Sequence, residues 1–376
     1  MNVAIVNRTN LKNFGSVLQV YALCEAVRKL GYEAEVVWQS GNMSMNYDIR
    51  PNKAFKTAVK LLLHPSLLRS TIKTIKDVNK VVIDEGKVKK FNDFVNSNFV
   101  QSFYAPEKLV EIAASNKYEK FICGSDQIWC TTTLYPDPMM YLRFAPKEKR
   151  VAYAPSLGRN FIPNYNKRTL KKYISDVSFV SVREDEGQKL IKELTGRDAV
   201  VVADPTLLMR SEEWNKLIIE TTTPNNYVLC YFLDEPLTEV KDAICKYAKQ
   251  SDKDVVVLGK LNITEYPSER VHYPIAGPGE FLSLVSKANM VITDSYHGML
   301  FAINYHKKFW SVERVYSQFD QSSRQITVLS RLGLDNRYVK GDFIFTDAEI
   351  DYDGVQIKVD EFVSLSMNYL EESLKA

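Results

Sequence analysis

The sequence has few of the residues that form disulfides or bind metals. Its five cysteines lie far apart without a CxxC pair, and its four histidines show no metal-ligand spacing. It also lacks a GxSxG motif. These absences argue against a disulfide scaffold, a metallohydrolase and a serine hydrolase, and they lead us to expect no metal site. We expect the cysteines to be buried free thiols in a reducing compartment.

Long apolar runs are missing too. No run is long enough to cross a bilayer, and residues 1–6 enter a strand pattern without the charged region and cleavage site of a secretion signal. We therefore expect a cytoplasmic protein, at the inner face of the plasma membrane if it touches lipid. With 45% hydrophobic and 25% charged residues among 376, the chain is expected to fold as two globular domains.

Positive charge is concentrated in one stretch. Residues 50–90 contain eleven Lys or Arg against three Asp or Glu, interspersed with Phe, Val, Leu and Ile. This pattern predicts a basic amphipathic helix pair broken at Pro65, which is either a solvated face packed on the domain or an edge that rests on an anionic membrane. Few aromatic residues are interleaved with these cations, so we expect no nucleic-acid partner.

Short β-rich runs alternate with helical patterns along most of the chain, which is typical of parallel sheets wrapped by helices. The predicted strands of a first series are 2–6, 33–38, 119–123, 150–153, 178–182 and 199–202, and those of a second series are 227–232, 254–258, 290–293 and 308–312. A polar hinge at 220–226 separates the two series. The predicted fold class is α/β, with two Rossmann-like doubly wound domains that face each other.

The expected domain boundaries follow from this pattern. The first domain is 1–218, with a helical insertion at about 47–116 that caps one end of its sheet. The second domain is 226–345, and an amphipathic closing helix is expected within 346–376.

Two loops follow predicted strands of the first domain, where ligands of open parallel sheets bind. Asn13, Gly15 and Ser16 open a helix, with Gly15 permitting close backbone approach and Ser16 suited as its N-cap. This loop is either an anion site or a capped turn without a ligand.

The second of these loops runs from Gly124 to Trp129 and contains Ser125, Asp126 and Gln127. A carboxylate, an amide and an aromatic ring at a strand end suit a sugar. The alternative is a capped turn in which Trp129 is buried.

Charged side chains follow two further strands. Arg183 stands beside a helix N-terminus, where it is well placed to clamp a carboxylate or phosphate unless it pairs with the acidic residues at 184–186. Asp294 and His297 follow the strand at 290–293. His297 is either an acid–base group that lines a cleft or a histidine with a structural role only.

Six motifs together resemble the polysaccharide pyruvyl transferase family in order and spacing. They are NFGSVLQ (13–19), GSDQIW (124–129), YAPSLG (153–158), SVRE (181–184), DPT (204–206) and TDSYHG (293–298), and the resemblance covers about residues 1–340. It implies a GT-B-like arrangement of the two domains across a cleft. It also implies phosphoenolpyruvate as donor, a sugar of a capsular, exopolysaccharide or cell-wall glycan precursor as acceptor, and a pyruvate ketal as product, without a cofactor.

The resemblance also assigns roles to residues. Arg183 is associated with donor binding and His297 with catalysis, and Ser295 stands where many relatives have arginine. Arg324 resembles an arginine of the branch with serine at that place, and we expect it, with Ser295 and Gly298, to complete the donor site. The residues expected in the acceptor site or cleft are Asn13, Gly15, Ser16, Ser125, Asp126, Gln127 and Asp294.

The resemblance also suggests a lipid-linked acceptor, and if the acceptor is lipid-linked, residues 50–90 are the expected membrane contact. Two alternatives stay open from the sequence. One is a sugar-nucleotide glycosyltransferase on the same architecture, because a fold does not fix a function. The other is a non-catalytic subunit of a glycan-assembly complex, although Arg183 and His297 are both present.

Overall fold

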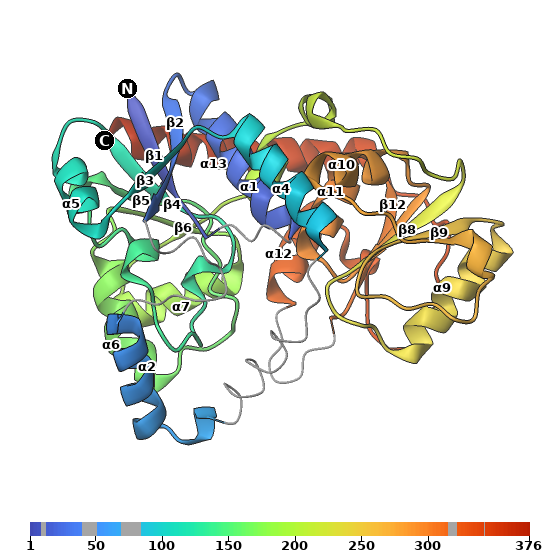
Figure 1. Cartoon of the computed structure of the whole chain (residues 1–376), viewed down its shortest axis with the longest axis horizontal. Helices are drawn as coiled ribbons and strands as arrows, with labels where there is room; N and C mark the ends of the chain where they lie inside the picture. The colour runs from blue at the N-terminus through green and yellow to red at the C-terminus, as the bar shows by residue number, and fades with distance from the viewer. Residues whose placement is uncertain (9–12, 40–50, 69–83, 315–321, 342) are drawn as a thin grey trace.

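The computed structural model describes residues 1–8, 13–39, 51–68, 84–314, 322–341 and 343–376. Two parallel sheets lie within these ranges, with strand orders β3-β2-β1-β4-β5-β6-β7 and β10-β9-β8-β11-β12-β13. In each sheet the first strand in the chain lies in the interior and later strands add on both sides, which is the doubly wound arrangement. The predicted α/β fold of two Rossmann-like domains is confirmed, and the two lie side by side in Figure 1.

The first sheet is built around buried apolar strands. Its strands are β1 (Asn2–Val6), β2 (Glu33–Gln39), β3 (Gln101–Tyr104), β4 (Lys120–Cys123), β5 (Arg150–Ala152), β6 (Phe179–Val182) and β7 (Val200–Val201). Its helices are α1 (Phe14–Lys29), α2 (Pro51–Leu63), α4 (Glu85–Asn98), α5 (Pro106–Ala114), α6 (Asn164–Ser175) and α7 (Asp185–Thr195). β1 and β4 are buried on both faces, which explains their nearly continuous apolar sequences.

The second sheet carries all four strands predicted for it. Its strands are β8 (Tyr227–Phe232), β9 (Asp254–Gly259), β10 (Val271–His272), β11 (Met290–Thr293), β12 (Lys308–Val312) and β13 (Tyr338–Val339). Its helices are α9 (Thr238–Gln250), α10 (Pro278–Lys287), α11 (Tyr296–Asn304) and α12 (Ser323–Leu332). The sequence missed the two short edge strands β10 and β13, because strands of two residues show no alternation.

The segment at 47–116 is not a purely helical insertion. Besides α2, α4 and α5 it contains β3, which pairs in parallel with β2 and forms the edge of the first sheet. β3 escaped prediction because a half-exposed edge strand needs no apolar run. Nor does α4 simply cap the first sheet, since its Lys90 forms an ion pair with Glu280 of α10 in the second domain.

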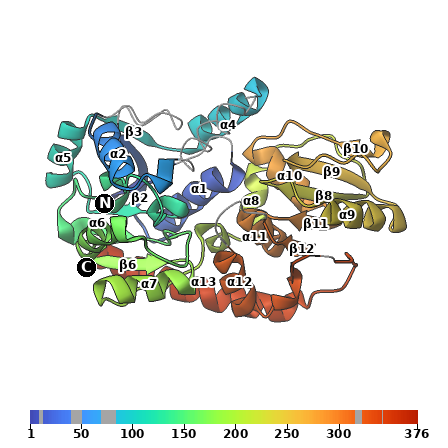
Figure 2. The ribbon, with the colours of Figure 1, turned by 90° about the horizontal axis from the view of Figure 1, so that it is seen from below.

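The last helix, α13 (Tyr352–Lys375), returns to the first domain and ties the two domains together. The Tyr369 hydroxyl donates a hydrogen bond to the Ala152 carbonyl (2.9 Å), and the Ser366 hydroxyl accepts one from the Ala203 N–H (2.8 Å). Figure 2 shows α13 running along one side of the molecule toward the C-terminus beside the first sheet. Across the described ranges, no helix combines the length and apolar character needed to span a bilayer.

Candidate active site

His297 lies in the first turn of α11, directly after β11. Ser295 is the N-cap, and its hydroxyl accepts a hydrogen bond from the Gly298 N–H (3.3 Å). A Cβ at Gly298 would lie 2.6 Å from Thr293 Oγ1, so glycine lets the helix start this close to the strand. The helix includes His297, whose side chain is therefore held by helical backbone.

The imidazole of His297 packs against the start of α1, in the other domain. A Cβ at Gly15 would lie only 2.1 Å from His297 Cγ, so the missing side chain at this position makes room for the ring. Asn13 caps α1 by accepting a hydrogen bond from the Ser16 N–H (3.1 Å), so the prediction of Ser16 as the cap was wrong. Residues 10–12 of the predicted loop lie outside the described residues.

Asp204, just after β7, connects the two domains at this point. Its Oδ2 lies 2.7 Å from Arg183 Nη1 and 3.5 Å from His297 Nε2, and it accepts a hydrogen bond from the Ser125 hydroxyl (3.3 Å). Its Oδ1 accepts hydrogen bonds from the backbone N–H (3.0 Å) and the hydroxyl (2.8 Å) of Thr206. One fully buried carboxylate thus links the predicted donor arginine to the predicted catalytic histidine.

Arg183, directly after β6, is fully buried in the same cluster. Its Nη2 donates a hydrogen bond to Asp126 Oδ1 (3.1 Å), and its guanidinium carbon lies 4.6 Å from the centroid of the Tyr296 ring. The guanidinium carbon of Arg324, on α12, lies 5.6 Å from the same centroid. Two cations from different domains therefore share one aromatic ring, which stabilises both by cation–π attraction.

The predicted alternative in which Arg183 pairs with its acidic sequence neighbours is wrong. Glu184 Oε1 accepts hydrogen bonds from the Ser156 hydroxyl (2.9 Å) and from the backbone N–H of residue 157 (2.7 Å). Asp185 faces the second domain, where it pairs with Arg331 (3.1 Å). The cluster around Arg183 is therefore assembled from distant parts of the chain.

Three buried polar atoms of this cluster have no hydrogen-bond partner. They are Arg183 Nε, the hydroxyl of Tyr296 and His297 Nε2, whose 3.5 Å separation from Asp204 Oδ2 is an ion-pair contact without hydrogen-bond geometry. Buried polar groups in folded proteins are nearly always satisfied, so three together at a domain boundary indicate a place for a bound molecule. An arginine N–H, a tyrosine O–H and an imidazole N–H are all donors, and such a set suits an anion.

The GSDQIW loop contributes its carboxylate but not its aromatic ring. Asp126 adopts a positive φ of 68°, a conformation that is uncommon outside glycine and that directs it toward Arg183. Trp129 is buried, stacks on Tyr141 with the ring centroids 5.2 Å apart, and donates from Nε1 to the backbone carbonyl of residue 140. The interpretation of Trp129 as a platform on which a sugar stacks is therefore wrong. The side chain of Gln127 lies beside the backbone of residue 158.

Asp294 lies outside the cluster. Its Oδ1 accepts a hydrogen bond from the Leu233 N–H (2.7 Å) and its Oδ2 one from the Asp234 N–H (3.1 Å), so it fixes the loop after β8. Burial raises the pKa of Asp294 to about 6, although these two hydrogen bonds and the nearby Arg314 oppose the rise.

The two carboxylates of the cluster are held ionised. Burial alone would raise the pKa of Asp204. The nearby His297 and, to a smaller extent, Arg183 outweigh burial and hold that pKa well below its ordinary value. Burial likewise opposes ionisation of Asp126, and Arg183, then His297 and Arg324, lower its pKa. The charges of this buried cluster thus compensate one another across the domain boundary.

This compensation predicts a pH-dependent contribution to stability. Because the folded-state pKa of Asp204 is depressed, its ion pairs stabilise the protein above the unfolded-state pKa of about 4 and lose their effect as pH falls through the folded value. Asp204→Asn should therefore lower the free energy of unfolding more at neutral pH than at about pH 3. Urea unfolding of both proteins at the two pH values measures this, and an equal difference at both would contradict it.

With this geometry established, the comparison with family models is decisive. The model of the polysaccharide pyruvyl transferases matches residues 13–314, which include all six motifs and every residue of the cluster except Arg324. The chain belongs to the polysaccharide pyruvyl transferase family. The predicted resemblance is confirmed.

Other comparisons say less about this pyruvyl transferase. Curated protein sequences yield no match. Among solved structures, UDP-GlcNAc 2-epimerase from Neisseria meningitidis is 12% identical over 100% of this chain and 93% of its own, with a TM-score of 0.45. UGT89C1 from Arabidopsis thaliana, complexed with UDP-L-rhamnose, is 10% identical over 98% and 93%, with a TM-score of 0.48. The fold assignment rests on the sheet order above and not on these distant likenesses.

Two residues of the pyruvyl transferase cluster were missing from the predicted site. Asp204 and Tyr296 each belong to one of the six motifs and each follows a strand, so the sequence did carry a signal for them. Their partners lie far away in the chain or in the other domain, which the sequence pattern does not reveal.

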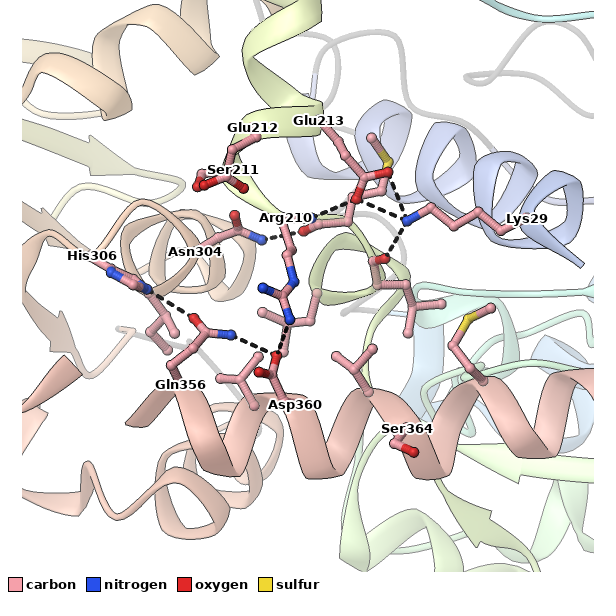
Figure 3. Close-up of a pocket in the computed structure, with 17 residues that line it drawn as sticks. Lys29, Arg210, Ser211, Glu212, Glu213, Asn304, His306, Gln356, Asp360 and Ser364 are labelled. Carbon is pink, nitrogen blue, oxygen red and sulfur yellow. Dashed lines mark hydrogen bonds and ion pairs between the residues drawn. The ribbon is translucent and has the colours of Figure 1, made fainter. Parts of the chain in front are cut away.

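A pocket of about 470 Å³ lies elsewhere on the domain boundary of this pyruvyl transferase. It is lined by the segment from η4 (Pro205–Leu208) through α8 (Ser211–Trp214), the end of α11 and one face of α13. Figure 3 shows two ion pairs among the side chains that line it: Lys29 with Glu213 (2.8 Å) and Arg210 with Asp360 (3.1 Å). Since no predicted site residue lines it, we do not assign the active site to this pocket.

The close approach of Gly15 to His297 gives a steric prediction. Gly15→Ala should displace the imidazole and lower pyruvyl transfer by at least about tenfold, because a small misplacement of a catalytic group has a large effect on rate. Gly86→Ala is the matched control, since Gly86 is also the second residue of a helix, α4, and a Cβ there would come no closer than 3.1 Å to a neighbouring atom. Equal steady-state rates for the two variants would contradict the assigned geometry.

Proposed function

We propose that this pyruvyl transferase moves a pyruvyl group from phosphoenolpyruvate to a sugar of a capsular, exopolysaccharide or cell-wall glycan precursor and forms a pyruvate ketal. The observation that carries the proposal is the set of unsatisfied donors on Arg183, Tyr296 and His297 at the domain boundary. Phosphoenolpyruvate has a carboxylate and a phosphate, so it offers acceptors of the charge that this set requires.

The donor would be held by groups from both domains. Arg183 from the first domain and Arg324 from the second supply positive charge around the Tyr296 ring. The N-terminus of α11, capped by Ser295, adds backbone N–H groups and the positive end of a helix dipole. Because the donor atoms are buried, substrate entry requires the domains to separate, and closure then excludes water from the reaction.

His297 acts as the general acid in this proposal. It gives a proton to the methylene carbon of phosphoenolpyruvate, which becomes a methyl group, and the adjacent carbon becomes electrophilic. Asp204, with Oδ2 3.5 Å from His297 Nε2, orients the ring and offers a negative charge opposite the imidazolium.

The ketal then forms by two bonds to the electrophilic carbon. A first sugar hydroxyl adds and loses its proton, the carbon–oxygen bond to phosphate breaks, and a second hydroxyl of the same sugar closes the ring. One hydroxyl proton replaces the proton spent by the acid and the other leaves with phosphate, so the reaction balances without a metal or another cofactor. Asp126, whose side chain is 25% exposed, is our candidate for the group that accepts the proton of the attacking hydroxyl. The carboxylate of Asp294 is not available for this role, because both of its oxygens accept hydrogen bonds from backbone N–H groups.

The setting of the reaction is part of the proposal. All five cysteines are free, and four of them are buried, as expected for a protein of a reducing compartment. We therefore propose that the transfer takes place in the cytoplasm.

Phosphate release from phosphoenolpyruvate tests the proposal. Purified protein, in a chelator and without added metal, is incubated with galactosides, mannosides and N-acetylhexosaminides, and phosphate is measured against time. We expect release that depends on one class of acceptor. Absence of release with every acceptor, together with binding of a nucleotide sugar, would instead favour the glycosyltransferase alternative.

A further inference from the structure

The helix α2 presents its apolar side to solvent. Phe55, Leu62 and Leu63 are 70%, 79% and 71% exposed, and Val59 between them is exposed as well. These positions recur at i, i+4, i+7 and i+8, which places them on one face of the helix. A contiguous apolar helix face directed at water usually marks a binding surface.

The opposite side of α2 is polar and lies on the protein. Lys53, Thr57, Lys60 and His64 are all half-buried. Lys60 Nζ donates a hydrogen bond to Asn166 Oδ1 (2.7 Å), and burial lowers the pKa of Lys60 to about 8. This orientation is the reverse of an ordinary surface helix, whose apolar face packs on the core. Among the residues that the structure describes, none covers the apolar face of α2.

The charged residues in α2 and in the sequence that follows it have one sign. From residue 51 through 76 the sequence contains six Lys or Arg and no Asp or Glu, and Lys56 is exposed on α2 itself. Apolar side chains flanked by cations alone are what an anionic bilayer surface attracts. A second copy of the chain would bring its own cations against these, so self-association is disfavoured by charge.

The position of α2 relates it to the active site. It follows the carboxyl end of β2, and Asn166, which Lys60 contacts, donates hydrogen bonds to the carbonyls of Thr131 (2.7 Å) and Thr133 (2.8 Å). Those threonines come shortly after the Asp126 loop, and carboxyl ends of parallel strands lie at one edge of the sheet. Figure 1 shows α2 beside α6, away from the second domain.

We propose that α2 docks the protein on an anionic membrane, with Phe55, Leu62 and Leu63 inserted below the headgroups and Lys56 among them. Docking at this edge would present lipid-linked sugars to the site. That link to the acceptor rests on the proposed function, whereas membrane docking itself does not.

Vesicle flotation with the full-length protein tests the docking. Phosphatidylcholine vesicles with and without phosphatidylglycerol are compared, and the bound fraction gives a partition coefficient. We expect binding to the anionic vesicles, weakened by salt, and we expect Phe55→Ser/Leu62→Ser to lower the partition coefficient by about tenfold or more. Phosphate release with a soluble acceptor should stay unchanged in this variant, which separates a failure of docking from a failure of the proposed reaction.

Ile357→Ser/Leu365→Ser is the matched control, because it removes two exposed apolar residues from another helix, α13. Its partition coefficient should equal that of the unmodified protein. Absence of binding to anionic vesicles, equal binding to the neutral ones, or equal loss in both double variants would overturn the proposal. So would a dimer in light scattering that Phe55→Ser/Leu62→Ser dissociates while vesicle binding is absent, since the cover would then be a second copy.

Discussion

Replacement of His297 by alanine is expected to lower acceptor-dependent phosphate release by about 10²–10⁴-fold, the usual contribution of general acid–base catalysis. The imidazole reaches the domain boundary from the first turn of α11, and Asp204 and the backbone of Gly15 hold it there. Loss of the ring removes the proposed proton donor but leaves Arg183 and Arg324 in place. The effect should therefore appear mainly in kcat, with a small change in KM for phosphoenolpyruvate.

The matched control for this variant is His306→Asn. His306 stacks on Tyr352 with the ring centroids 4.6 Å apart, at the far end of α11 from His297, and asparagine tolerates its positive φ of 51°. It should retain the unmodified rate. If His297→Ala kept full activity while thermal unfolding showed it folded, the assignment of His297 as the acid would fail.

Replacement of Arg183 by methionine is expected to lower the free energy of unfolding by about 3–5 kcal/mol, because it leaves the buried Asp204 carboxylate without its arginine partner. Arg183 and Asp204 are both 0% exposed, and Asp126 would lose its hydrogen bond as well. Methionine fills a similar volume, so the loss reflects charge rather than a cavity. Chemical denaturation at neutral pH measures the change.

Arg331→Met provides the comparison. Arg331 also pairs with an aspartate, Asp185, at 3.1 Å, but the two side chains are 37% and 49% exposed, and exposed pairs contribute at most about 1 kcal/mol. Adding Asp204→Asn to Arg183→Met should recover part of the lost stability, because the remaining partner is then neutral. Equal losses for the two arginine variants would show that burial does not decide the strength of these pairs.

Much of this fold was accessible from the sequence because its central strands are buried on both faces. β1, β4, β8 and β11 are nearly continuous apolar runs, and their positions were predicted to within a residue. Edge strands gave weaker signals, and β3 was missed inside a segment that otherwise reads as helical. Short half-exposed strands depend on their neighbours in the sheet, which no local pattern records.

The site was predictable in kind but not in its connections. Arg183, Asp126 and His297 were found because each follows a strand, and parallel topology gathers the carboxyl ends of strands. The pairing of Arg183 with Asp204 depends on how the ends of two neighbouring strands of the first sheet come together, and the contact of His297 with Gly15 depends on how the two domains meet. A pattern along one chain does not encode either geometry, and the choice between a surface and an interior position for Trp129 likewise depended on its stacking with Tyr141.

The central claim is transfer of a pyruvyl group with protonation of the methylene carbon, and mass spectrometry of the acceptor after reaction in heavy water tests it most directly. The account predicts an acceptor that carries a pyruvate ketal whose methyl group has gained deuterium from solvent. An acceptor that instead carries an enolpyruvyl ether, or a sugar from a nucleotide donor, would contradict it.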